Sequence, residues 1–174
     1  MNAAFMGEHK ISVTLATPDS MQQLTMRKTS FNAFLLVATL FSLMTGCGKK
    51  KVAPVSDRIA KVWTAQKVDY NNATVYTKGG AANVQAGYDK FKLDLSKPPT
   101  VIYDEFDGNR FTGQYSVPSD DRLVLTNLNP SPTGANGTIE FRISNLTDNS
   151  VTLTRTTDSQ KTGNTTNIYT LTAP

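Results

Sequence analysis

Histidine and cysteine are almost absent from this chain of 174 residues: each occurs once, as His9 and Cys47. One cysteine cannot form a disulfide within the chain, so stability must come from the core alone. From Cys47 onward the chain also lacks the residues for a Ser-His-Asp or Cys-His nucleophile and for the His and Cys sites that zinc favours. Chemistry based on carboxylates alone, as in glycoside hydrolysis, is not excluded. We therefore expect no cofactor, no metal site and no enzymatic activity.

Long apolar runs are also scarce, and the only one, residues 31–44, is shorter than the ~20 residues of a membrane-spanning helix. Met26-Arg27-Lys28 precedes it and Thr45-Gly46-Cys47 follows it. A basic start, an apolar core and small residues at the end are the marks of a secretory signal. Residues 43–47 resemble the bacterial lipobox, in which the cysteine thiol is joined to diacylglycerol. The alternative is a buried apolar helix with an incidental cysteine.

These marks predict how the chain is organised. Residues 1–25 are expected to be disordered and to precede the true start, and residues 26–46 form the lipoprotein signal peptide, with a helix in its apolar part. Residues 47–57 are then a tether, and residues 58–174 form a single β domain. Because two or more acyl chains anchor a protein stably, lipid on Cys47 would hold this domain permanently at a membrane.

The part of the chain expected to fold has little net charge of either sign. The whole chain carries +4, but from Cys47 onward fifteen Lys and Arg face twelve Asp and Glu, and three of the basic residues are Lys49, Lys50 and Lys51 of the tether. The domain is thus close to neutral and has no basic stripe, which excludes nucleic acid as the expected partner. The three lysines either lie against anionic lipid headgroups or form a solvated linker.

Short alternating runs of apolar and polar residues dominate the chain from Ile59 onward, and no helical periodicity extends beyond one turn. In residues 139–144, for example, every second residue is apolar. Such alternation favours antiparallel strands with one face in water, arranged as a barrel or a sandwich. The sequence predicts eight or nine strands, at residues 62–70, 74–77, 88–95, 100–106, 110–117, 122–128, 138–145, 151–157 and 167–172.

One hairpin allows a prediction of register. With Gly108-Asn109 as a two-residue turn, Asp107 pairs with Arg110 and Phe106 pairs with Phe111. This register is preferred to a turn at Asp107-Gly108, because a shift by one residue would turn the apolar side chains to the wrong face. The expected buried face consists of Ile102, Phe106, Phe111 and Tyr115, and the expected wet face of Tyr103 and Glu105.

Several short motifs resemble the lipocalin-like domains common in lipoproteins of the Bacteroidetes. The matching pieces cover nearly all of residues 60–172 and are Val62-Trp63-Thr64, Phe-Lys-Leu-Asp-Leu at 91–95, Phe-Thr-Gly-Gln-Tyr-Ser-Val at 111–117, Ile-Ser-Asn-Leu-Thr at 143–147 and Val-Thr-Leu-Thr at 151–154. The resemblance implies an all-β fold, an antiparallel up-and-down barrel of about eight strands.

Two departures from that family pattern stand out. Lys61 occupies a position where the family usually has glycine, and the Gly-rich segment 78–87 is either a mobile lid or a long connection. No acidic signal for the cell surface follows Cys47. The resemblance therefore implies a location in the cell envelope, lipid-anchored to the outer membrane and facing the periplasm.

The residues expected inside the barrel line either a ligand cavity or a packed core, because eight strands enclose just enough room for side chains or one small ligand. They are Trp63, Phe91, Ile102, Phe106, Phe111, Tyr115 and Phe141.

Three functions are weighed. The first is a binding module for a small apolar or amphipathic ligand, favoured by a cavity above about 300 Å³. The second is a structural or protein-interaction lipoprotein of the envelope, favoured by a filled interior and exposed apolar residues such as Tyr103 and Val101. The third is a carbohydrate-active enzyme with paired carboxylates, the least favoured.

Overall fold

The structure, a computed structural model, describes residues 51–173. The predicted start at Met26, the signal peptide, and the predicted lipid site Cys47 lie outside the described residues. Helix α2 (Val55–Ile59) begins within the segment predicted to be the tether, and two 3₁₀ turns, η2 (Ala86–Lys90) and η3 (Gln160–Thr162), lie between strands. None of the helices in this part of the chain is both long and apolar enough to cross a membrane.

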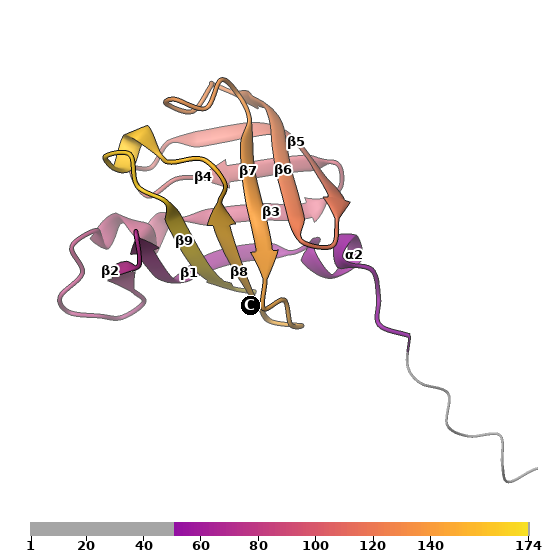
Figure 1. The fold of residues 1–174 in the computed structure, drawn as a ribbon, viewed down its shortest axis with the longest axis horizontal. Helices are drawn as coiled ribbons and strands as arrows, with labels where there is room; N and C mark the ends of the chain where they lie inside the picture. Colours follow the sequence, from indigo (N-terminus) through magenta and orange to yellow (C-terminus); the bar gives the residue numbers. More distant parts are fainter. Residues whose placement is uncertain (1–50, 174) are drawn as a thin grey trace, which may run out of the picture. The chain divides into compact units, whose positions relative to one another are not determined.

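Nine antiparallel strands form one sheet in the order β2-β1-β3-β4-β5-β6-β7-β8-β9, and a further pairing of β1 with β9 closes it (Figure 1). Closure leaves β2 outside the ring, as a ninth strand added to β1. The predicted all-β, up-and-down barrel is thereby confirmed. The strands are β1 (Val62–Tyr70), β2 (Ala73–Thr77), β3 (Lys92–Lys97), β4 (Thr100–Asp104), β5 (Arg110–Ser119), β6 (Arg122–Asn129), β7 (Ile139–Ser144), β8 (Ser150–Arg155) and β9 (Asn167–Thr172).

Strand β1 is long enough to pair with three other strands. Its first residues pair with β3, its last four pair with β2, and its other edge pairs with β9. The pairing with β9 shifts between Ala65 and Lys67, where β1 has one extra residue. Such a bulge changes which side chains face inward. As a result Val68, and not Lys67, lies in the core.

The two ends of the barrel differ. At one, called the α2 end, tight turns join β3 to β4 and β5 to β6, and a five-residue loop joins β7 to β8. Here Ile59 is fully buried, and its carbonyl oxygen accepts a hydrogen bond of 2.8 Å from the indole nitrogen of Trp63. The guanidinium of Arg58 donates to the Leu146 carbonyl oxygen at 2.7 Å, which ties helix α2 to the β7–β8 turn. The other end, called the loop end, contains η2, η3 and the longer connections.

Alternation along the strands fills the interior with large side chains. Strand β7 shows the pattern clearly, since Ile139, Phe141 and Ile143 are buried while the residues between them reach solvent. Apolar burial of this kind is the main stabilising contribution to such a fold. The largest fully buried side chains are Trp63, Tyr88, Tyr103, Phe91, Phe141, Ile59, Leu93, Leu95, Leu123, Leu125, Ile139 and Leu153.

The predicted register of the β4–β5 hairpin is wrong. Strand β4 ends at Asp104, which pairs with Arg110, and Tyr103 pairs with Phe111. The connection is a five-residue loop, in which the Glu105 backbone N–H donates to the Asn109 carbonyl oxygen. The longer loop turns the faces of β4 around. The expected wet residues Tyr103 and Glu105 are buried, whereas Ile102 lies on the outer face and Phe106 lies in the loop.

Candidate functional site at the loop end

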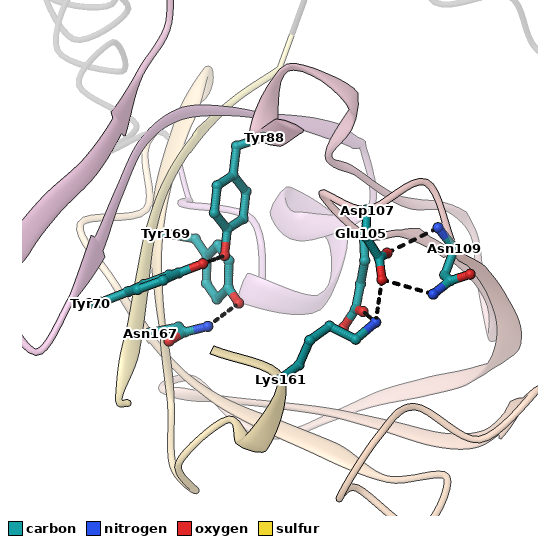
Figure 2. Close-up of polar contacts among 8 residues, drawn as sticks. All are labelled: Tyr70, Tyr88, Glu105, Asp107, Asn109, Lys161, Asn167 and Tyr169. Carbon is teal, nitrogen blue, oxygen red and sulfur yellow. Dashed lines mark hydrogen bonds and ion pairs between the residues drawn. The ribbon is translucent and has the colours of Figure 1, made fainter. Parts of the chain in front are cut away.

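Four tyrosines gather at the loop end and are called the tyrosine cluster: Tyr70, Tyr88, Tyr103 and Tyr169. The hydroxyls of Tyr70 and Tyr88 are 2.9 Å apart and share a hydrogen bond (Figure 2). The ring of Phe91 stacks on Tyr169 with centroids 5.1 Å apart, and the ring of Tyr103 meets Phe91 edge-on at 5.7 Å. The apolar core therefore ends in a layer that presents hydroxyl groups.

A buried amide ties this layer to the β8–β9 connection. The side chain of Asn167 donates to the Tyr169 hydroxyl at 3.1 Å, and its oxygen accepts from the hydroxyls of Thr162 and Thr165 at 3.0 and 2.8 Å. The two threonines belong to the segment that contains η3, and η3 itself has no buried residue. Polar contacts, and not apolar burial, hold this segment over the end of the barrel.

An ion-pair group, called the lysine clasp, joins the same segment to the β4–β5 loop. The Lys161 ammonium donates to the carboxylates of Glu105 and, at 2.9 Å, of Asp107 (Figure 2). The side chains of Lys161 and Glu105 are only 17% and 7% exposed. The ammonium also lies 5.6 Å from the centre of the Phe111 ring. The clasp connects two loops that are 54 to 56 positions apart in the sequence.

The clasp alters the pKa of its members. Burial raises the pKa of Asp107. The hydrogen bond from Lys161 and the backbone bond from Asn109 together lower it by more, so that the pKa lies below the ordinary 3.8. For Lys161, burial lowers the pKa and the bonds to Glu105 and Asp107 raise it by more, so that its pKa lies above 10.5. Lys161 and Asp107 are both charged at neutral pH.

Arg155, the last residue of β8, points inward at this end and is 6% exposed. Tyr169 pairs with Leu153, the inward residue two positions before Arg155. Burial is the main cause that raises the pKa of Tyr103 and Tyr169, and the charge of Arg155 lowers both. Its Nε atom is buried and has no hydrogen-bond partner. Among residues 51–173 there is no side-chain hydrogen bond or ion pair to Arg155, although buried polar groups are usually satisfied.

Close packing of the loops covers this end. A Cβ atom at Gly87 would lie 2.4 Å from the Phe106 carbonyl oxygen, so η2 rests directly on the β4–β5 loop. A Cβ at Gly134 would lie 2.5 Å from the Gln160 side chain, so the β6–β7 loop rests on η3. The Gly-rich segment 78–87 is mostly exposed, and Asn83 fastens it with bonds to Thr77 and Gly80. Its movement as a lid stays a prediction.

The seven residues predicted for the interior divide into two groups. Five are buried in the core: Trp63, Phe91, Phe111, Tyr115 and Phe141. Ile102 and Phe106 are not, because the β4–β5 register differs, and Phe106 instead packs on Tyr88 from the loop with ring centroids 4.8 Å apart. The alternation of β8 could have revealed Arg155, since it continues the inward positions of Val151 and Leu153.

The outer surface contains a shallow pocket of about 70 Å³, lined by Asp121, Arg122, Glu140, Phe141, Arg142 and Thr156. This volume is far below the roughly 300 Å³ at which ligand pockets begin. Arg122 and Glu140 are paired across it at 2.6 Å. No group of three His, Cys, Asp or Glu residues within 51–173 could hold a metal ion.

The tyrosine cluster allows a prediction about alkaline pH. Burial raises the pKa of all six tyrosines above 10, and that of Tyr70 to about 12. A raised folded pKa means that the folded state holds protons that the unfolded chain releases from pH 10 upward. The free energy of unfolding should therefore be unaffected by tyrosine below pH 10 and fall as pH rises through 10 to 12.

Ultraviolet absorbance of tyrosinate and circular dichroism, followed together against pH, check this expectation. Tyrosine ionisation should coincide with loss of the barrel. Ionisation centred on pH 10 in a chain that keeps its β signal would contradict the burial of the hydroxyls.

Comparison with protein families found no match for this chain, and comparisons with curated proteins and with solved structures found none either.

Proposed function

We propose that the chain is an envelope lipoprotein, anchored through Cys47 at the outer membrane and facing the periplasm, whose barrel binds a small apolar or amphipathic ligand at the loop end. The lipocalin-like motifs of the sequence support this proposal, as does the closed barrel. The proposal includes no catalytic activity, because the residues from Cys47 onward contain no histidine and their one cysteine is the proposed lipid site.

The observation that carries the proposal is the contrast between the two ends of the interior. The α2 end is closed by apolar side chains such as Ile59 and Trp63. The loop end keeps Arg155, Asn167 and tyrosine hydroxyls beneath η3, which has no buried residue of its own. Segments with few buried apolar contacts open at low cost in free energy. A ligand with an apolar body and a polar group would thus enter past η3 and meet polar partners there.

A second candidate function has an observation of its own in its favour. The interior is occupied by aromatic side chains that are almost completely buried, among them Trp63, Tyr103 and Phe141. Such packing suits a structural or protein-interaction lipoprotein, whose outer surface meets another envelope protein. The strongly exposed Val84 in the Gly-rich segment is an apolar residue that could take part in such a contact.

Native mass spectrometry of residues 51–174 separates these candidates. The fragment contains all core residues and strand pairs found in the part of the chain that the structure describes, and these include the closure of β1 on β9. It also lacks Cys47, so attached lipid cannot be mistaken for a ligand. After incubation with an extract of bacterial membrane lipids, we expect one small molecule per chain, recoverable by solvent extraction. A barrel that stays empty over a wide range of extract concentrations would favour the second candidate.

The lipid anchor has its own test. Replacing Cys47 with serine should abolish incorporation of a labelled fatty acid and leave the unprocessed precursor, because serine offers no thiol for the diacylglycerol. The measurement is a gel shift and label count after expression in a bacterium. A matched Thr45→Ser variant should be labelled and processed normally. Labelling that persists in Cys47→Ser would refute the lipoprotein assignment.

A further inference from the structure

Arg155 poses a question that the proposed function does not answer. A buried cation normally has a counter-ion or a full set of hydrogen bonds, because removing it from water is costly. Arg155 is 6% exposed, and its Nε atom is buried without a partner. Since Arg remains protonated in proteins, this group cannot relieve the cost by losing its charge.

Two other polar side chains that are buried at the loop end, Glu105 and Asn167, are already engaged. The carboxylate of Glu105 accepts from Lys161. The Asn167 oxygen accepts from Thr162 and Thr165, and its amide nitrogen donates to Tyr169. Among residues 51–173 the guanidinium therefore has no ion pair, and its Nε is the one buried polar side-chain atom without a hydrogen-bond partner.

We infer that Arg155 binds an oxyanion, the carboxylate or phosphate head group of an amphipathic ligand. A guanidinium presents N–H groups in a planar fork that matches the two oxygens of such a head group. Tyr169 pairs with Leu153, which lies two positions before Arg155 on the inward side of β8, and it offers a hydroxyl donor at the same end of the barrel. Burial raises the pKa of Tyr169 above 10, so this hydroxyl stays protonated at neutral pH. This inference deepens the proposed function and rests on it, because it names the chemical class of the ligand.

The position of Arg155 fits the route of entry past η3. It is the last residue of β8, directly before the connection that contains η3 and Lys161. Opening that connection would expose the guanidinium first, so an anionic head group would be attracted to the same end through which the apolar part enters. The head group would then lie at the loop end, with the apolar part of the ligand against the tyrosine cluster.

Isothermal titration calorimetry on residues 51–174 tests the inference with four probes: decanoate and decyl phosphate below their micellar concentrations, decanol below its solubility limit, and acetate. Hydrogen bonds to charged groups contribute more than neutral ones, which corresponds to roughly 10- to 100-fold in affinity. We expect decanoate or decyl phosphate to bind that much more tightly than decanol. Arg155→Met, which keeps an unbranched side chain but removes the guanidinium, should reduce the affinity for the anionic probe to that for decanol.

Arg142→Met is the matched control, because Arg142 lies on the neighbouring strand β7 with its side chain exposed. It should keep the preference for the anion. The melting temperature of each variant without ligand shows that the barrel is folded, and Arg155→Met should melt higher than the unmodified chain, because an unpaired buried charge is removed. If Arg155→Met melted lower than the unmodified chain, Arg155 would not be an unpaired buried charge.

The outcomes separate the inference from the proposed function. Equal binding of decanol and decanoate would overturn the role of Arg155 while keeping an amphiphile-binding barrel. A preference for decanoate that survives Arg155→Met would also overturn it. Binding of none of the three ten-carbon probes would overturn both statements. Binding of acetate as tight as that of decanoate would leave Arg155 as an anion site and refute the amphipathic ligand.

Discussion

Replacing Trp63 with alanine should lower the free energy of unfolding by about 3–5 kcal/mol, the usual cost of removing a large buried aromatic side chain. Trp63 has no exposed surface and pairs with Leu93 across β1 and β3. The change leaves a cavity at the α2 end and also removes the donor to the Ile59 carbonyl oxygen. Because the free energy of unfolding of small domains is only about 5–15 kcal/mol, this one change would remove a large part of it.

Urea unfolding followed by far-ultraviolet circular dichroism measures the effect, since Trp63 is the single tryptophan and its fluorescence is lost in the variant. Trp63→Phe should cost less than Trp63→Ala, because the ring still fills much of the space. Val84→Ala, at a strongly exposed apolar residue, should change stability by less than about 0.5 kcal/mol. A Trp63→Ala variant as stable as the Val84→Ala control would show that the α2 end is not closed by the indole.

The second large effect is expected from the lysine clasp. Lys161→Met leaves the buried Glu105 carboxylate without its cation, and breaking a buried ion pair in this way costs about 3–5 kcal/mol. The value should lie near the lower limit, because Asp107 is one-third exposed and can be solvated. Loss of the cation above the Phe111 ring adds about 0.5–1 kcal/mol.

Surface pairs provide the comparison. Arg122→Met breaks the pair with Glu140, in which the arginine side chain is half exposed, and should change the free energy of unfolding far less than Lys161→Met, because water screens the pair. The double variant Lys161→Met with Glu105→Gln should recover part of the loss, because the unpaired charge is removed as well. If Lys161→Met and Arg122→Met were equally stable, the clasp would be a surface contact and η3 would not depend on it.

The strand pattern could be predicted from the sequence because the interior imposes a period of two on nearly every strand. The predicted limits of β1 and β9, residues 62–70 and 167–172, coincide with those observed, since turn residues flank both runs. The β6 strand differs by one residue at its end. Alternation between a wet face and a core face is a property of the strand itself, and it can be recognised without knowledge of the partner strands.

The β4–β5 hairpin was predicted wrongly for a local reason. Phe106 extends an apolar pattern, but the side chain of Asp107 bonds to the backbone and side chain of Asn109, which forms a turn that competes with strand pairing. Gly108 adopts a φ of +86° in that turn. Strand β4 therefore ends two residues before Phe106, and its faces are exchanged with respect to the prediction.

The loop end illustrates which part of a site can be found from a sequence. Arg155 continues the inward positions of β8, so its polar side chain at a core position is a signal that alternation contains. The pairing of Lys161 with Glu105 leaves no such signal in the sequence, because the two residues are 56 positions apart and the segment around Lys161 has no periodicity. Contacts between irregular loops depend on the closed barrel that brings them together.

The pairing of β1 with β9 also determines the order in which the barrel can be completed. It joins the first strand of the ring to the last, and at Thr64 and Thr172 the partners are 108 positions apart. When a chain emerges with its N-terminus first, from a ribosome or a translocation channel, the barrel cannot close until β9 is available. Until then the edges of β1 and β8 are unpaired and exposed to other chains. Closure of the barrel thus waits for β9, and the time before β9 is available is when the domain most needs protection.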